Sequence, residues 1–226
     1  MPSLKHIFFL VLALIAFVSL SCHETPEHEQ TFYPYWHQKA SLFELLPDLD
    51  SEIVFLGDSL TDGCNWSEML QDPRVVNRGI SGDTTYGVLA RLDEVVESKP
   101  MKVFLMIGIN DLATGTQAKE VVYNIKQIVK AMHKKSPDTE IILQSLLPVN
   151  KDFDFFKNHT SKTEHIIRIN RALENFARTN EITYLNLHPL FATKENKLHP
   201  DFTNDGLHLN GSGYLRWKKA VEKHIN

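Results

Sequence analysis

The stretch IVFLGDSL at residues 53–60 decides the fold of this chain. Four consecutive apolar residues closed by a glycine are typical of a strand that is buried on both faces of a parallel sheet. The polar residues that follow then lie at the carboxyl end of the strand, which is where open α/β sheets bind their ligands. We therefore expect a functional site around Ser59.

Four further short apolar runs follow, separated by segments with helical spacing. The runs lie at residues 75–76, 103–107, 141–143 and 182–187. Apolar residues recur at the 3.6-residue period of a helix within residues 88–96, 121–132 and 166–177, and a last helix is expected from residue 212 or 213 to residue 225. Ser161 and Glu164 have the spacing of a capping box ahead of the third stripe. Residues 149–160 are the only long irregular stretch expected.

Strand and helix therefore alternate about five times along the chain. Connections between parallel strands are right-handed and place their helices on the faces of the sheet. The alternation predicts an α/β fold, a three-layer α/β/α sandwich with a five-stranded parallel sheet. Neither an internal repeat nor a second domain is indicated.

The composition excludes several classes of protein. The chain has 226 residues, of which 42% are hydrophobic and 23% charged, with a formal net charge of −4. These values are average for soluble globular proteins and exclude a disordered or collagen-like chain. The absence of a basic block argues against a surface that binds nucleic acid or anionic lipid through charge. A small molecule is the more plausible partner.

The first residues of the chain resemble a secretory signal. Lys5 precedes residues 7–20, which carry no charge but fall short of the roughly twenty apolar residues of a transmembrane helix. A small residue directly before Cys22 resembles the cleavage site of bacterial lipoproteins, where the cysteine becomes lipidated. Ser19 stands where such sites usually carry leucine. We favour lipidation of Cys22 over ordinary cleavage that leaves a free thiol.

The expected organisation has three parts. Residues 1–21 form the signal peptide, residues 22–31 a polar tether, and residues 32–226 the folded domain. The protein is then exported, as a membrane-anchored lipoprotein in the periplasm or at the cell surface. If Cys22 is not lipidated, the alternative is a soluble secreted protein.

Polar motifs follow the expected strands. They read GDSL at residues 57–60, NRGISGD at 77–83, GIND at 108–111 and DGLH at 205–208. Each alone is an ordinary turn or helix cap. Together they supply a hydroxyl, an imidazole with a nearby carboxylate, and donors for an oxyanion, which are the parts needed for acyl transfer.

In order and content, these motifs resemble the four blocks of the SGNH, or GDSL, hydrolases. The resemblance covers essentially the whole folded domain and implies that its α/β/α sandwich is flavodoxin-like. It implies that Ser59 is the nucleophile, that His208 is the general base, and that Asp205 orients the imidazole of His208.

The resemblance also implies three donors for the oxyanion. They are the backbone N–H groups of Ser59 and Gly82 and the side-chain amide of Asn110. Gly79 is the alternative to Gly82, but Gly82 directly precedes Asp83, as the donor glycine does in similar proteins.

Other polar residues are expected to be structural. Asp58 and Asp111 more plausibly bond the backbone of their turns than take part in chemistry. Cys64 is expected to be a packed side chain, and His188 and His199 to be structural. The chain has eleven histidines but no His-Glu-x-x-His pattern and no Cys/His cluster at zinc spacing, so neither a metal nor another cofactor is expected.

Within the superfamily, the chain looks nearest to bacterial esterases that are similar to platelet-activating-factor acetylhydrolase catalytic subunits and to thioesterase/lysophospholipases. This implies a short-chain acetylesterase whose substrates are esters of carbohydrates or of other small molecules. One alternative is a lysophospholipase or acyl thioesterase, in which Phe153, Phe155 and Phe156 line an acyl groove. The competing interpretation packs at least two of these rings beneath the neighbouring helix. A further alternative is a catalytically silent glycan-binding lipoprotein.

Overall fold

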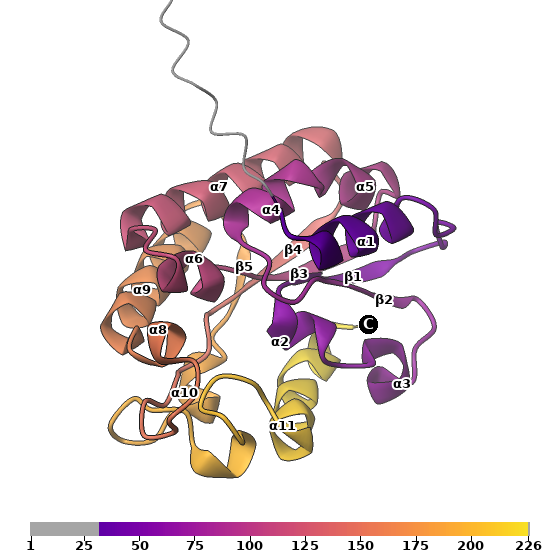
Figure 1. Ribbon diagram of the computed structural model, residues 1–226. Coiled ribbons are helices and arrows are strands. Elements are labelled where there is room, and N and C mark those ends of the chain that lie inside the picture. Colours follow the sequence, from indigo (N-terminus) through magenta and orange to yellow (C-terminus); the bar gives the residue numbers. More distant parts are fainter. Residues whose placement is uncertain (1–31, 226) are drawn as a thin grey trace, which may run out of the picture. The chain divides into compact units, whose positions relative to one another are not determined.

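Five parallel strands form one sheet in the order β2-β1-β3-β4-β5 (Figure 1). The computed structural model describes residues 32–225. The strands are β1 (Ile53–Gly57), β2 (Val75–Gly79), β3 (Lys102–Met106), β4 (Glu140–Gln144) and β5 (Thr183–Leu185). The predicted five-stranded parallel sheet is confirmed. Because the strand order reverses direction between β1 and β3, a ligand site is expected at the carboxyl ends of these two strands.

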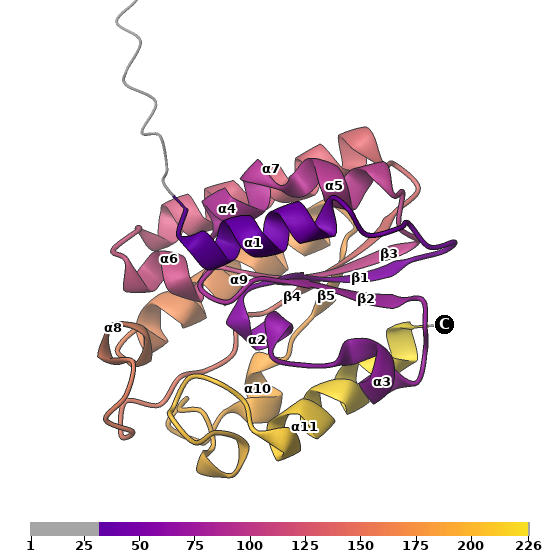
Figure 2. The same cartoon turned by 45° about the vertical axis from the view of Figure 1, so that its right-hand side comes forward.

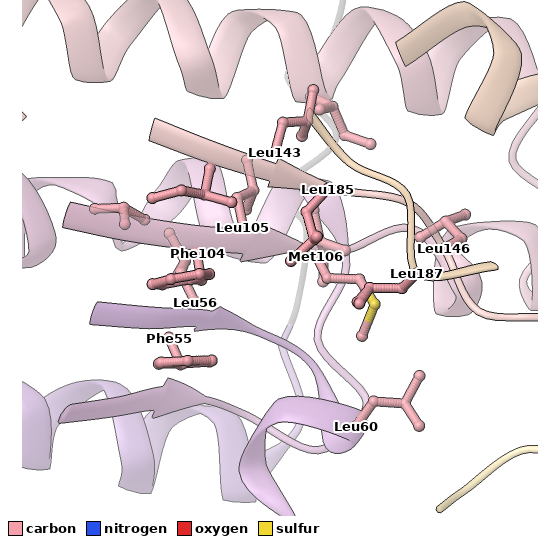
Figure 3. Close-up of a cluster of buried hydrophobic side chains, with 14 of the residues drawn as sticks. Phe55, Leu56, Leu60, Phe104, Leu105, Met106, Leu143, Leu146, Leu185 and Leu187 are labelled. Atoms are coloured by element: carbon pink, nitrogen blue, oxygen red, sulfur yellow. The ribbon is translucent and has the colours of Figure 1, made fainter. Parts of the chain in front are cut away.

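The central strands are buried because helices cover both faces of the sheet. Every residue of β1 and β3 is buried. Phe55 pairs in register with Phe104 on the neighbouring strand, and their rings stack with centroids 4.6 Å apart (Figure 3). The ring of Trp66 stacks on the other side of Phe55 at 4.2 Å. These aromatic contacts fix β1, and with it the turn that carries Ser59.

Figure 2 shows the helices in two layers. One face of the sheet carries α1 (Pro34–Phe43), α4 (Thr85–Ala90), α5 (Leu92–Glu97) and α7 (Ala118–Lys135). The other carries α2 (Ser59–Asp62), α3 (Trp66–Leu70), α10 (His188–Phe191) and α11 (Gly211–Val221). The remaining helices are α6 (Ile109–Ala113), α8 (Lys157–Thr160) and α9 (Thr163–Thr179), with short 3₁₀ turns η1 (Pro200–Phe202) and η2 (Glu222–His224). This is the predicted three-layer sandwich.

The helix expected over residues 88–96 is in fact two helices. They meet at Arg91, whose backbone leaves the helical conformation at φ −112° and ψ 16°. Its side chain is buried and donates to Asp83 Oδ2 at 2.9 Å and to the Arg78 carbonyl at 2.9 Å. Hydrophobic spacing does not record this break, because Arg91 is held by polar contacts with β2 and with the loop before α4.

The capping box expected at Ser161 is wrong. Ser161 ends α8, with φ −83° and ψ 2°, instead of adopting the extended conformation of an N-cap. The next helix begins at Thr163 with Lys162 before it and no side-chain cap. Residues 149–160 are therefore not wholly irregular, since α8 occupies their end.

The predictions for the N-terminus, which are the signal peptide, the lipidation of Cys22 and the tether, lie outside the described residues. Across residues 32–225, no helix combines the length and the apolar character needed to span a bilayer.

Candidate active site

Ser59 is the first residue of α2 and follows β1 directly. The Asp58 carboxylate caps α2 by accepting the Leu60 N–H at 3.0 Å. The turn is tight at Gly57, where a Cβ would lie 2.3 Å from the Met106 carbonyl oxygen, so only glycine fits there. The serine side chain is thereby held at the carboxyl end of a central strand.

A chain of two hydrogen bonds joins Ser59 to His208 and Asp205. Ser59 Oγ lies 3.1 Å from His208 Nε2, although the residues are 149 positions apart. His208 Nδ1 lies 2.8 Å from Asp205 Oδ2. An imidazole held in this way can take the proton of the hydroxyl while the carboxylate stabilises its charge. The structure thus brings together the three residues that the sequence motifs singled out.

One tight turn holds Asp205 beneath the imidazole. Asp205 Oδ1 accepts the backbone N–H groups of Leu207 and His208, both at 2.8 Å. Gly206, between them, has φ +81°, which glycine adopts without strain. One carboxylate oxygen therefore holds the turn and the other holds the imidazole.

The hydrogen bonds of Asp205 also keep it ionised. Burial acts to raise the pKa of this carboxyl, but the bonds from His208 Nδ1 and from the backbone N–H groups of Leu207 and His208 outweigh burial, so the pKa lies below its usual range. Asp205 therefore presents a negative charge to His208.

The loop after β2 places Gly82 for donation. Gly82 has φ +81°, and within the described part of the chain no acceptor pairs with its N–H or with the N–H of Ser59. The N–H of Gly79, by contrast, donates to Asn77 Oδ1 at 2.8 Å. The geometry favours Gly82 over Gly79 as a donor to substrate.

Asn110 is joined to the same loop. Its Nδ2 donates one hydrogen to the Asp83 carbonyl at 2.8 Å, which leaves the second hydrogen for another acceptor. The loop is tied to the end of β1 as well, since the Ile80 N–H donates to the Gly57 carbonyl at 3.1 Å. An amide and two backbone N–H groups fixed by such bonds can stabilise a developing oxyanion without reorganising.

Two buried carboxylates hold this loop in place, one from within the loop and one from α6. Asp83 accepts from Trp36 Nε1 at 3.0 Å and pairs with Arg91. Asp111 accepts the Thr85 backbone N–H and hydroxyl at the start of α4. Asp111 is thus structural, but it bonds the start of α4 and not the backbone of its own turn, which was the expectation.

Asp58 is fully buried beside the turn that carries Ser59. Burial, together with the nearby Asp83 and Asp111, raises the pKa of its carboxyl from 3.8 to about 7, although the bond from the Leu60 N–H acts to lower it. Between pH 3.8 and about 7 the unfolded chain has lost this proton while the folded chain keeps it. Asp58 therefore makes the free energy of unfolding fall as the pH rises across this window.

Asp58→Asn removes that titration and retains an oxygen to accept the Leu60 N–H. We expect the stability of the variant, measured relative to the native protein by urea unfolding, to increase between pH 4 and pH 8 by up to about 4 kcal/mol. The surface variant Asp138→Asn serves as the control with no such trend. Parallel pH profiles for Asp58→Asn and the native protein would show that Asp58 is already ionised at low pH.

The phenylalanines after β4 do not all pack inward. Phe155 and Phe156 are 60% and 45% exposed, so the interpretation that at least two of the three rings lie beneath a helix is wrong. The ring of Phe156 meets that of His208 edge to face at 4.9 Å. Its backbone is left-handed, with φ 47°, because it turns the chain into α8. Phe153 is half-buried.

The remaining candidates have structural surroundings. Cys64 is buried, and burial raises the pKa of its thiol to about 11, so the thiol stays protonated. His199 caps η1 by accepting the Asp201 N–H. The backbone N–H of His188 donates to Ser145 Oγ at 2.8 Å. Residues 32–225 contain no group of three His, Cys, Asp or Glu side chains placed to hold a metal ion.

Sequence reasoning missed two residues at the site. The ring of Tyr33 covers Gly82, where a Cβ would lie 2.7 Å from the tyrosine hydroxyl. Burial, with the nearby charges of Asp83 and Asp62, raises the pKa of Tyr33 to about 12. The run of aromatic residues at 32–36 is the sequence feature that could have indicated a role for Tyr33. The second residue, His159, lies in no motif, and its Nε2 is 3.0 Å from Asn110 Oδ1.

Comparison with known proteins places this geometry in a family. The bovine (Bos taurus) platelet-activating factor acetylhydrolase IB subunit alpha1 is 29% identical over 180 residues, which are 77% of this chain and 75% of the bovine protein. A GDSL-like lipase from Bacteroides thetaiotaomicron has 25% identity and a TM-score of 0.75, covering 84% of this chain and 96% of the lipase. An acetyl xylan esterase, AlAXEase, shares the fold at 21% identity and a TM-score of 0.64, covering 77% of this chain and 100% of that enzyme.

One protein family matches most of the described residues. Residues 55–216 match the GDSL-like Lipase/Acylhydrolase family, which spans the motifs from the end of β1 to α11. The resemblance read from the motifs is confirmed, and the chain belongs to the GDSL-like lipase/acylhydrolase family of carboxylic ester hydrolases.

Proposed function

We propose that this protein is a serine esterase that removes short acyl groups, acetyl above all, through an acyl-enzyme. The observation that carries the proposal is the pair of hydrogen bonds from Ser59 to His208 and from His208 to Asp205, at 3.1 Å and 2.8 Å. The chain belongs to a family of ester hydrolases, and its proposed nucleophile is already hydrogen-bonded to its proposed base. Both facts support acyl transfer as the reaction.

The reaction begins with attack by Ser59 Oγ on the ester carbonyl carbon while His208 Nε2 takes the serine proton. The carbonyl oxygen becomes an oxyanion that accepts from the N–H groups of Ser59 and Gly82 and from the free Nδ2 hydrogen of Asn110. His208 then gives its proton to the departing alcohol, which leaves an acyl group on Ser59.

The second half repeats these steps with water. His208 takes a proton from a water molecule, whose oxygen attacks the acyl carbon, and the same donors stabilise the second oxyanion. Collapse returns the proton to Ser59 Oγ and releases the carboxylic acid. The charge of Asp205 stabilises the imidazolium in both halves.

Two observations support a short acyl group. The bovine relative is named an acetylhydrolase. Between residue 32 and β1 the structure has a single helix, α1, and the ring of Tyr33, directly before it, covers Gly82 and occupies space beside a proposed oxyanion donor. The half-exposed side chains of His208 and Asp205 suit a bulky or varied alcohol, for which we propose a carbohydrate or another small molecule.

We also propose that the enzyme acts outside the cytoplasm. This rests on the sequence of residues 1–22 alone, with a lipid anchor on Cys22 as the contact with a membrane. No nucleic-acid partner is proposed, because the net charge is −4.

A lysophospholipase or acyl thioesterase is the second candidate, and the exposed rings of Phe155 and Phe156 favour it. Phe156 lies against the proposed base, so an acyl chain that leaves the site along this side would contact apolar surface.

A series of p-nitrophenyl esters distinguishes the two. We expect kcat/KM to be highest for acetate and to fall with chain length, because the alcohol is constant and only the acyl group changes. Faster turnover of octanoate than of acetate would overturn the short-chain proposal. Acid release from acetylated sugars, acyl phospholipids and acyl-CoA then identifies the alcohol, with acetylated sugars expected to react fastest.

A further inference from the structure

The imidazole of His159 contacts the side chain that we propose as an oxyanion donor. His159 Nε2 lies 3.0 Å from Asn110 Oδ1, across 49 positions of sequence. His159 belongs to α8, which packs against α6, the helix that carries Asn110 (Figure 1). Neither the four motifs nor the proposed reaction uses this histidine.

The bonds of Asn110 determine which nitrogen of His159 carries hydrogen. Asn110 Nδ2 is the end that faces the Asp83 carbonyl, because a carbonyl can only accept. Oδ1 therefore faces His159, and since Oδ1 can only accept, His159 Nε2 must donate. The orientation of the amide is thus fixed at both ends, and one Nδ2 hydrogen remains for a substrate oxygen.

His159 is held neutral while it does this. Burial lowers the pKa of its imidazole, and the positive charges of His208 and Lys162 lower it further. A neutral imidazole with hydrogen on Nε2 satisfies Oδ1 without placing a second cation beside the proposed base.

The backbone of α8 holds the imidazole in place. The N–H groups of His159 and Thr160 both donate to the Phe156 carbonyl, at 2.7 Å and 2.9 Å, and Thr160 is buried. The ring of Phe156 meets the imidazole edge to face at 5.8 Å. The donating imidazole is therefore carried by a one-turn helix whose backbone is hydrogen-bonded, and it packs against the ring of Phe156.

We propose that His159 is a positioning residue for Asn110. By donating to Oδ1, it keeps the amide plane in the orientation that aims the free Nδ2 hydrogen at the oxyanion, and it polarises the amide so that this hydrogen is a stronger donor. The proposal rests on the function assigned above, because it presumes that Asn110 binds the oxyanion.

Three substitutions at this position separate donation from packing. In His159→Gln the amide nitrogen can reach the place of Nε2, whereas in His159→Asn the amide nitrogen is one bond too short. We expect His159→Asn and His159→Ala to lower kcat for p-nitrophenyl acetate by roughly tenfold, since one hydrogen bond is lost. His159→Gln should stay within about threefold of the native enzyme, and KM should change little in all three.

A double-mutant cycle with Asn110→Ala tests whether the effect passes through the amide. Asn110→Ala alone should lower kcat by about 10²–10³. In that background His159→Ala should cause no further loss, because the group it positions is gone. Thermal unfolding and fluorophosphonate labelling of each variant show that the fold and the nucleophile are intact.

The outcomes are distinguishable. If Asn110→Ala leaves kcat unchanged, the proposed role of Asn110 fails, and the positioning role with it. If Asn110→Ala is slow but His159→Ala lowers kcat equally in both backgrounds, only the positioning role is overturned. Equal loss in His159→Gln and His159→Asn would also overturn it, because packing and not donation would then matter.

Discussion

Ser59→Ala is expected to lower kcat for p-nitrophenyl acetate by at least about 10⁴-fold and to abolish covalent labelling by a fluorophosphonate probe. Alanine has no atom that can bond to the acyl carbon or to phosphorus, so neither intermediate can form. The backbone N–H of residue 59, Gly82 and Asn110 remain as donors, so weak acceleration over water persists. Loss of Asn110 alone should be less severe, because the acyl-enzyme can still form.

The control for this variant is Ser67→Ala, an exposed serine of α3, which should keep full activity and labelling. Labelling of Ser59→Ala at the native rate would place the nucleophile elsewhere. A native protein that is neither labelled nor active on any ester would instead favour a glycan-binding module on the same fold. Circular dichroism of both variants shows whether the fold is retained.

Asp205→Asn is expected to lower kcat by about 10⁴-fold at neutral pH. The N–H groups of Leu207 and His208 require an acceptor at the position of Oδ1, so the new amide turns its oxygen to them. Its NH₂ group then faces His208 Nδ1 and donates to it. The imidazole hydrogen must move to Nε2, which faces Ser59 as a donor and can no longer take the serine proton.

The matched control is Asp201→Asn. Asp201 also lies near a histidine, with His199 Nδ1 3.6 Å from Asp201 Oδ2, but on an exposed turn. We expect this variant to retain native kcat. An Asp205→Asn enzyme within tenfold of native activity would contradict the tautomer argument and reduce Asp205 to a turn-forming residue. NMR of the His208 ring nitrogens in the variant reports directly which one carries hydrogen.

The sheet could be predicted from sequence because its strands are short apolar runs separated by segments with helical spacing. Burial on both faces leaves a signal that is local to each strand, such as residues 53–57 and 103–107. The break between α4 and α5 could not be predicted in the same way. It depends on the buried bond between Arg91 and Asp83, and no pattern within the helix itself records that bond.

The motif residues of the site could be found because their chemistry is carried in short, ordered blocks. Ser59, Asp205 and His208 each lie in such a block, GDSL or DGLH. Sequence motifs could not reveal His159 and Tyr33. Their places beside Asn110 and Gly82 depend on how the segment after β4 and the segment before β1 fold over the ends of other strands. A single side chain in a connecting segment gives no periodicity and no motif.

The residues of the candidate site lie on separate segments of the chain, and this has an evolutionary consequence. Phe155, Phe156 and His159 all belong to the connection between β4 and α9, whereas the serine, the aspartate and the histidine of the proposed triad lie on other segments. Substitutions of Phe155 and Phe156 can therefore alter which esters are accepted while His159 and the groups that make and break bonds stay in place. Phe156 also holds a left-handed backbone that a glycine adopts more easily. Replacing Phe156 with glycine would remove the ring that lies against His208 and relieve the backbone strain in one step, so new substrate preferences can arise on this scaffold by single mutations.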